Sequence, residues 1–422
     1  MNIVFFVLIA AAFAVAGWNQ MAGVAGAVPM EALGQAAVTA AQDAVTLGIG
    51  LIGSMALFLG LMKVAEASGL MRGAALLLRP LLVRLFPSVP AGHPAMGAMV
   101  MNVAANVIGL SNAATPFGVK AMRQLDRLNP CKGIASDAMV LFLAINTANV
   151  TLVPTHVMAL RTALGSHDPA AVVPTTLVAT TGATVLAVVV ARLGGRWFPV
   201  PVRPGPDELA TVEEEEEVEA PPPPLPAWAS GLALLAVAAI LPLTVMFGRS
   251  LSPWIIPTMM VAILGVALVK GVALYDAFIE GARDGLDISV RILPYLVAIL
   301  VAVGMFRQSG AMDLLLGPVG RLTAPLGLPP EALTMSVLRS LSGSASFGYL
   351  AALLKDPAIG PDSYLGMLVS TIYGSSETTF YVLAVYFGAA GVRRIRHALL
   401  AGLLADAAGL LLSAAVCGWL YR

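Results

Sequence analysis

The chain has 422 residues, of which 58% are hydrophobic and only 11% are charged. Soluble domains carry about 25% charged residues, so a soluble globule of this size would lack the charge to cover its surface. The 24 basic residues are balanced by 24 acidic ones, and no basic excess points to a nucleic acid as partner. The composition therefore excludes a soluble enzyme, a disordered chain and a nucleic-acid binder, and it predicts an all-α polytopic protein in a lipid bilayer.

Apolar stretches long enough to cross a bilayer recur along the chain. A hydrocarbon core of about 30 Å takes about 20 helical residues. Residues 2–18 lack the basic residues that open a signal peptide, and we expect an uncleaved membrane helix there. About nine transmembrane helices are predicted, over residues 2–18, 44–62, 138–158, 173–193, 228–247, 254–270, 287–306, 363–387 and 398–420.

Two further apolar segments, 93–118 and 330–354, are interrupted in the middle by Gly, Ser and Asn residues. Each half of such a segment has only ~10–15 residues, which is too short to cross the membrane. Irregular backbone at membrane depth is tolerated where it lines a cavity or is buried in protein. We therefore predict that each segment forms a re-entrant helical hairpin.

A polar linker, residues 199–227, separates two domains that span residues 1–198 and 228–422. The linker contains five consecutive glutamates and four consecutive prolines, which neither enter a bilayer nor pack into a core. We expect a solvated tether there, and an acidic tail that binds a partner is the alternative.

The same kinds of segment follow one another in the same order in both domains. Residues 60–69 and 301–310 each close a predicted span and end in Ser-Gly, and each is followed by a Pro-bearing amphipathic segment, a hairpin and two spans. Within this order, residues 94–102 align with 331–339, and 146–149 align with 374–377. One repeat of this length indicates a duplicated unit rather than a solenoid of many copies.

Basic residues in the short loops set the expected orientation, because Lys and Arg concentrate in cytoplasmic loops. Segment 19–43 has no Lys or Arg and is expected outside, whereas Arg393, Arg394 and Arg396 place the last loop inside. The loops between spans 44–62 and 138–158 carry Lys63, Arg72, Arg79, Arg84, Lys120, Arg123, Arg127 and Lys132. These counts predict a cytoplasmic N-terminus and linker, an external C-terminus and two halves of inverted topology, the signature of an alternating-access transporter.

The first hairpin carries the strongest local signal for a binding site. Asn102 and Asn106 are four residues apart and share one helix face, and Asn112 is suited to cap the returning helix after a break at Gly109. A helix N-terminus at membrane depth suits an anionic or polar substrate group, and unwound carbonyls suit a cation. The candidate substrate-binding residues of this hairpin are Asn102, Asn106, Ser111, Asn112 and Thr115. Alternatively, the asparagines only hold the hairpin together through hydrogen bonds between its helices.

The second domain places two charges, Arg339 and Glu377, within apolar segments. Such charges are costly in a membrane and usually face a partner or water. We expect the two residues to pair, either at a site for a substrate, proton or cation or as a buried pair that fixes the fold. Small polar neighbours add Ser342, Ser344 and Thr378 as candidate substrate-binding residues.

Asn146 and Asn149 form the matching polar face in the first domain, and Pro154 would bend that span. Their role is either to bind a substrate or to pack the helices together as small polar residues. Asp406 is another acid in an apolar run, and we expect it near the cytoplasmic end of its span.

No motif for enzyme chemistry occurs in the sequence, neither a nucleophile elbow nor a Walker A loop nor paired metal-ligand spacings. The four histidines and two cysteines are scattered, so no catalytic residue, metal site or cofactor is expected. Without an ATP site, any transport would be passive or coupled to an ion.

Residues 58–69, 93–97, 109–116 and 143–147 resemble spore maturation protein A. Residues 292–297, 306–311, 379–383 and 386–389 resemble spore maturation protein B. The chain therefore resembles a fusion of two proteins of the nucleoside-recognition, or Gate, family. This resemblance implies a Gate-type fold but no particular solute. The sequence departs from spore maturation protein B at Ser340, where that protein typically has proline.

These observations predict a carrier or channel in the bacterial inner membrane for a small polar solute or ion. Its site would lie near the midplane, between the two hairpins and the spans that carry Asn149 and Glu377. A membrane scaffold or regulatory protein of spore or envelope maturation, without transport activity, is the alternative, and a membrane-embedded enzyme is a third. A homo-oligomer is plausible, since spans outside the repeat offer a scaffold.

Overall fold

The fold is built from α-helices. A computed structural model describes residues 2–23, 30–199, 227–312 and 327–421, with 314, 318, 320 and 323, and this part of the chain contains no β-strand. The side chains of residues 2–4, 111–113 and most of 227–249 are not described. The predicted linker lies outside the described residues except for its two ends. Five helices in the described part are long and apolar enough to cross a membrane, which confirms the all-α, membrane-type fold.

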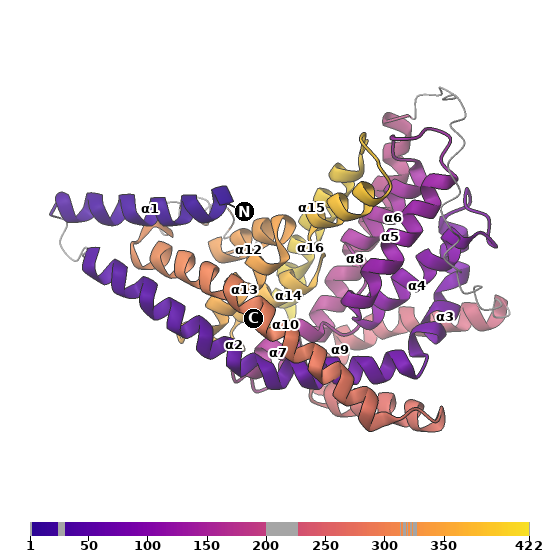
Figure 1. Cartoon of the computed structure of the whole chain (residues 1–422), viewed down its shortest axis with the longest axis horizontal. Helices are drawn as coiled ribbons and strands as arrows, with labels where there is room; N and C mark the ends of the chain where they lie inside the picture. The colour runs from indigo at the N-terminus through magenta and orange to yellow at the C-terminus, as the bar shows by residue number, and fades with distance from the viewer. Residues whose placement is uncertain are drawn as a thin grey trace.

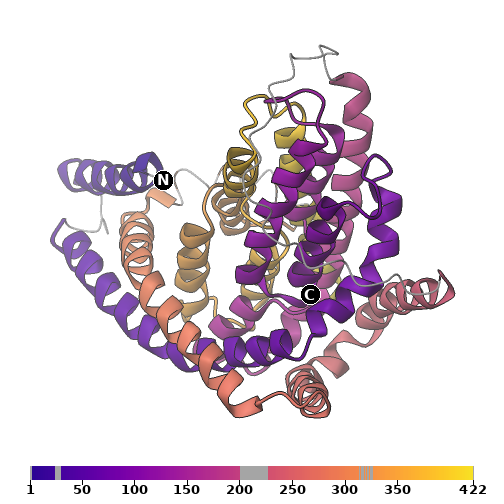
Figure 2. The same cartoon turned by 45° about the vertical axis from the view of Figure 1, so that its right-hand side comes forward.

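Two long helices, one from each domain, pack side by side along one flank of the molecule. Helix α2 (Met30–Ala67) and helix α10 (Leu274–Gln308) run antiparallel, since Gly48 contacts Leu293 and Gly60 contacts Phe278. Helix α1 (Asn2–Met21) packs against the C-terminal end of α10 (Figure 1). In Figure 2, α2 and α10 again lie together beside the rest of the bundle.

Both long helices end in the repeated Ser-Gly pair. Gly69 and Gly310 have φ angles of 77° and 76°, in the left-handed region where glycine pays no steric penalty. Ser68 and Ser309 each donate a side-chain hydrogen bond to the carbonyl oxygen three residues earlier, at 2.9 and 3.1 Å. The sequence repeat at 60–69 and 301–310 is therefore also a repeat of local structure. After Gly69 the chain continues into α3 (Leu70–Leu85).

Both predicted hairpins are present as pairs of helices with a break between them. The first consists of α4 (Pro94–Ile108) and α5 (Ser111–Arg127), which extends beyond the expected end at residue 118. Gly109 closes α4 with φ 92°, and Leu110, not Asn112, precedes the first residue of α5. The cap expected at Asn112 is therefore wrong, because the helix resumes directly after the left-handed glycine.

The second hairpin consists of α12 (Pro330–Leu341) and α13 (Gly343–Lys355). Its break is a single extended residue, Ser342, with φ −158° and ψ 118°. The Ser342 hydroxyl accepts a hydrogen bond from the backbone N–H of Ala345 at 3.3 Å and so caps α13.

Two segments expected to be continuous spans are interrupted helices. The segment predicted over 138–158 forms α6 (Asp137–Thr147) and α7 (Thr155–Ala163), with irregular backbone between them. The segment predicted over 363–387 forms α14 (Tyr364–Gly374), a break, α15 (Thr379–Val382) and the π-helical turn η3 (Leu383–Phe387).

The irregular backbone of these breaks is paired with neighbouring segments. The N–H of Leu152 donates to the carbonyl of Val107 at 2.9 Å, and the N–H of Glu377 donates to the carbonyl of Thr147 at 2.7 Å. Neighbours that satisfy backbone groups are what permits a broken helix away from water. Prediction of uninterrupted spans failed because apolar composition alone does not report such partners.

The last helices of the two domains also pack antiparallel. Helix α8 (Val172–Trp197) follows the short turn η1 (Pro169–Ala171), and helix α16 (Ala398–Tyr421) closes the chain. Gly194 near the end of α8 contacts His397 before α16, while the Tyr421 hydroxyl at the other end donates to the carbonyl of Ala171 at 2.8 Å. The final helices thus repeat the antiparallel relation of α2 and α10.

Helix α9 (Ala227–Val269) runs for 43 residues without a break, where two spans, 228–247 and 254–270, were expected. Prolines in the sequence between and within those spans, such as Pro253, do not end the helix. Membrane helices tolerate proline when neighbours compensate the lost hydrogen bond. The C-terminal part of α9, Ser250–Val269, is long and apolar enough to cross a membrane, in agreement with the second of the two expected spans.

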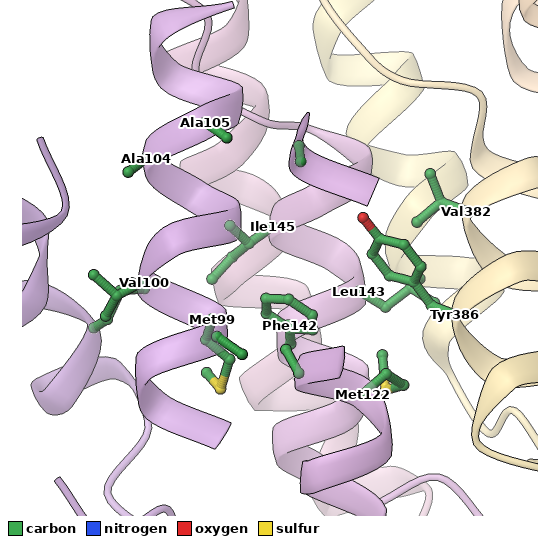
Figure 3. Packing of buried hydrophobic residues seen from close by; sticks show 14 of the residues in the cluster. Met99, Val100, Ala104, Ala105, Met122, Phe142, Leu143, Ile145, Val382 and Tyr386 are labelled. Atoms are coloured by element: carbon green, nitrogen blue, oxygen red, sulfur yellow. The ribbon is translucent and has the colours of Figure 1, made fainter. Parts of the chain in front are cut away.

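Aliphatic and aromatic side chains fill the space between the first hairpin, α6 and the π-helical turn. Figure 3 shows Met99 and Val100 of α4, Phe142 and Ile145 of α6, and Tyr386 of η3 in this cluster. The rings of Phe142 and Tyr386 stack with centroids 6.1 Å apart. The core therefore joins the first hairpin to an element of the second domain.

Candidate functional site

Four breaks in helices, two from each domain, meet at one place. Each hairpin break lies against the interrupted helix of its own domain: an added Cβ at Gly109 would lie 2.3 Å from the carbonyl oxygen of Val153, and one at Gly343 would lie 3.0 Å from the Thr378 hydroxyl. The two interrupted helices then touch through the hydrogen bond from Glu377 to Thr147. The site is therefore assembled from residues that are far apart in the sequence.

A cavity of about 480 Å³ opens between these breaks. Seven of the twelve predicted site residues line it: Asn106, Asn149, Arg339, Ser342, Ser344, Glu377 and Thr378. The other residues that line it are Gly109, Thr151, Val153, Pro154, Thr155, His156, Val157, Leu341, Gly343, Tyr373, Gly374, Ser376 and Tyr381. All four breaks contribute, so the wall combines polar side chains, helix ends and irregular backbone.

Arg339 braces the break of the second interrupted helix. Its Nε donates to the carbonyl of Ser376 at 2.8 Å, Nη2 donates to the same carbonyl, and Nη1 donates to the Thr378 hydroxyl at 3.2 Å. The guanidinium also lies over the ring of Tyr373, 4.5 Å from its centroid. With the residue only 7% exposed, most of its donor capacity is used inside the protein.

Glu377 is the other half of the predicted pair, and the pairing is confirmed. Nη2 of Arg339 lies 3.4 Å from Oε2 of Glu377, and the Glu377 side chain is 34% exposed, against 8% for Arg339. Both residues line the cavity, and the carboxylate is the more accessible of the two charged groups. Because the arginine is fixed by the backbone of residue 376, it holds the carboxylate in place and balances its charge.

The asparagines of the first domain separate into two groups. Asn102 donates to the carbonyl of Ala114 at 2.8 Å and to the Tyr386 hydroxyl at 3.2 Å, and it does not line the cavity. Asn146 accepts from Asn106 at 3.1 Å and lies behind it. The structure thus places Asn102 and Asn146 in a network that joins the hairpin to α6 and η3, and Asn106 at the cavity wall.

The remaining predicted residues lie at the edge of this arrangement. Asn149 lies in the first break and accepts a hydrogen bond from the Thr151 hydroxyl at 2.6 Å. Thr115 is partly buried in α5 and does not line the cavity. Ser111 and Asn112 form the first turn of α5, but their side chains lie outside the described part of the structure.

Sequence reasoning missed three cavity residues that are aromatic or ionisable. His156 follows the break in the first domain, and Tyr373 and Tyr381 flank the break in the second. The available signal was their position beside Pro154 and Glu377, within four residues of each break. Within the described ranges, no group of three or more His, Cys, Asp or Glu side chains comes together that would hold a metal ion.

The cavity is nearly balanced in charge. Arg339 and Glu377 offset one another, and the rest of the polar wall consists of amides, hydroxyls, one imidazole and backbone groups. Such a wall offers donors and acceptors without a strong net field, which suits a small polar solute of low net charge.

The sequence also matches known proteins. Residues 48–196 and 289–393 match the model of the Gate family, described as nucleoside recognition. Each matched segment contains one hairpin and one interrupted helix, so the elements around the cavity are those that the family shares. The chain belongs to the Gate family of membrane proteins.

Two relatives are spore maturation proteins from Bacillus subtilis strain 168. The chain is 40% identical to spore maturation protein B over 163 residues, which cover 39% of this chain and 90% of the relative. It is 41% identical to spore maturation protein A over 163 residues, which cover 39% of this chain and 83% of the relative. The resemblance predicted from the short sequence strings is therefore confirmed.

Proposed function

We propose that the chain carries a small polar solute or ion across the bacterial inner membrane and binds it in the cavity between the four breaks. The observation that carries this proposal is the convergence of all four helix interruptions on one polar cavity. In lipid, broken backbone is tolerated only where it is buried in protein or lines a water-filled space. Discontinuous helices that meet at a polar site are typical of secondary transporters.

The helix packing supports two inverted halves. Equivalent helices of the two domains, α2 with α10 and α8 with α16, pack antiparallel. Two copies of one unit that cross a bilayer in opposite directions would place equivalent helices in this relation. Each half would then present its hairpin to the site from the opposite side, as alternating access requires.

The proposed solute is polar and of low net charge. Glu377 is the anchoring group, because its carboxylate faces the cavity, and Arg339 holds that carboxylate through the ion pair and the bonds to the backbone. Asn106, Asn149 and Ser344 add neutral donors and acceptors on the remaining sides. A nucleoside-like solute satisfies these requirements, and so does a small zwitterion.

Uptake into proteoliposomes tests the proposal directly. The purified protein is reconstituted and offered a panel of labelled nucleosides, metal ions and small acids, beside protein-free vesicles. We expect at least one solute to accumulate, and Glu377→Gln to abolish its uptake, because the amide removes the negative charge from the cavity. Glu31→Gln is the matched control, since Glu31 lies exposed in the first turn of α2.

The scaffold alternative makes the opposite prediction. A scaffold of spore or envelope maturation keeps the fold but needs no solvated cavity. If no solute in the panel enters faster than into protein-free vesicles, and the Glu377→Gln variant behaves like the Glu31→Gln control, transport through this site is rejected.

A further inference from the structure

One buried carboxyl group lies behind the cavity and outside the segments that match the family. Asp406 of α16 is 7% exposed and is surrounded in the sequence by Ala, Leu and Gly. Both partners of its Oδ2 atom are hydroxyls: Ser340 donates at 2.5 Å and Thr379 at 2.6 Å.

The second oxygen of this carboxyl group is buried and has no partner. Oδ1 of Asp406 makes no hydrogen bond, and no Lys, Arg or His in the described chain forms an ion pair with the side chain. An ionised carboxylate with an unsatisfied buried oxygen is costly, whereas a proton on that oxygen removes the charge. The geometry therefore offers a place for one proton, on Oδ1.

The hydroxyls that contact Asp406 belong to the elements that form the cavity. Ser340 lies in α12, two residues before the hairpin break, and Thr379 is the first residue of α15, directly after the second break. A change in the charge of Asp406 changes the strength of these hydrogen bonds and so the fit between the breaks and α16.

Few other ionisable groups act on this carboxyl group from the helices packed against α16. Arg339 of α12 is adjacent to Ser340 and attracts the carboxylate, but its hydrogen bonds go to Ser376, Thr378 and Glu377. Glu377 forms its ion pair with Arg339, and the ring of Tyr373 in α14 lies against the same guanidinium. The remaining ionisable groups on packed elements are Glu331 near the start of α12, Tyr364 at the start of α14, Tyr381 of α15, Asp137 at the start of α6 and Arg192 and Arg196 near the end of α8.

We propose that Asp406 is a proton-binding site and that its protonation is coupled to rearrangement of the second hairpin and the second interrupted helix. A proton from water joins Oδ1 in one state and returns to water in another, and no other bond is made or broken. The coupling to a solute rests on the proposed function, but binding of the proton does not. If both hold, solute movement through the cavity is accompanied by proton movement.

Infrared difference spectroscopy tests proton binding without reference to a solute. The reconstituted protein is compared between mildly alkaline and mildly acidic buffer, where exposed carboxylates remain ionised. We expect a carbonyl stretching band of a buried carboxylic acid that shifts in heavy water. The band should be lost in Asp406→Asn and kept in Asp287→Asn, a matched control whose carboxyl is exposed on α10.

Two outcomes of the infrared experiment would show that Asp406 does not bind the proton. A band that persists in Asp406→Asn, or a spectrum that responds to sodium at constant pH instead of to protons, overturns the proposal. If Asp406→Asn does not fold, Ser340→Ala replaces it, because removal of one hydrogen bond to Oδ2 shifts the frequency of the same band. A band that does not move in that variant also overturns the proposal.

Coupling is then measured with a pH-sensitive dye inside the proteoliposomes. For any solute that the vesicles take up, we expect solute-driven proton movement in the unaltered protein and its loss in Asp406→Asn. Solute entry that moves protons equally well in Asp406→Asn overturns the coupling. Absence of uptake of every solute rejects the proposed function and leaves the infrared result to decide on the proton site alone.

Discussion

At the scale of single residues, the two charges of the cavity have different tasks. Arg339 is used almost entirely by the protein: two of its nitrogens donate to the carbonyl of Ser376, a third donates to Thr378, and its face lies over Tyr373. Glu377 is the more accessible of the two, since its side chain is 34% exposed against 8% for Arg339. Arg339 is therefore a positioning residue for the break, and Glu377 is the residue available to a solute.

This division predicts that Arg339→Gln lowers stability strongly. The substitution leaves the buried carbonyl of Ser376 without its donors, and an unsatisfied buried polar group costs about 1–3 kcal/mol. The partly exposed carboxylate of Glu377 loses its cation as well. We expect a clearly lower unfolding temperature in detergent. Arg291→Gln, which changes an exposed arginine of α10, is the control and should unfold like the unaltered protein. Equal stability of the two variants would show that Arg339 does not brace the break.

The sequence predicted these two residues because charges are rare in its apolar segments, and their pairing followed from that scarcity. It gave Asp406 less weight because that residue was expected near the cytoplasmic end of its span, and it treated His156 only as one of four scattered histidines. Asp406 becomes distinctive only through its contacts with Ser340 and Thr379, which lie 66 and 27 residues away in the chain. His156 reaches the cavity only because the chain is broken between α6 and α7. Contacts of this kind leave no periodic or compositional trace in a single sequence.

At the scale of elements, the hairpins were predictable and the interrupted helices were not. Gly109 and the Ser-Gly pair at 342–343 mark the hairpin breaks, because glycine and serine favour the backbone and the caps that a break requires. The breaks after Thr147 and Gly374 lie inside apolar stretches long enough to span a membrane. Only Pro154 and the short polar run at 375–378 signalled them, and the hydrogen bonds that satisfy their backbone come from other elements.

Packing of α2 against α10 gives a prediction at this scale. An added Cβ at Gly285 would lie 2.8 Å from backbone atoms of Ala56, and a backbone cannot rotate away as a side chain can. Gly285→Ala should therefore separate the two helices and destabilise the protein by about 1–3 kcal/mol, the usual cost of overpacking. Unfolding in detergent measures the difference.

The matched control for this substitution is Gly53→Ala in α2. Nothing lies within 4 Å of an added Cβ at Gly53, and alanine is the better helix former, so stability should stay equal or rise slightly. If Gly285→Ala is no more harmful than Gly53→Ala, the close approach of α2 and α10 does not carry the packing between the two domains.

At the scale of the whole molecule, basic loops from both domains collect at one end. Arg192 donates to the carbonyl of Leu85, Arg123 donates to the carbonyl of Ala389, and Arg396 donates to the carbonyl of Ala135. These contacts join the end of α3, the end of α8, the loop before α6 and the loop before α16. By the positive-inside rule we expect this end to face the cytoplasm, which is the orientation that we proposed from the loop charges.

A native cysteine allows this orientation to be tested without adding a label site. Cys131 is partly exposed in the loop at the basic end, next to Lys132, whereas Cys417 is buried in α16. A maleimide that does not cross membranes should therefore modify Cys131 in inside-out vesicles and leave it intact in whole spheroplasts. Cys131→Ser should abolish the labelling, since the buried thiol of Cys417 stays out of reach of the reagent. Labelling of Cys131 in spheroplasts would place the basic end outside and reverse the proposed orientation of both hairpins, while labelling that survives Cys131→Ser would show that α16 opens to water.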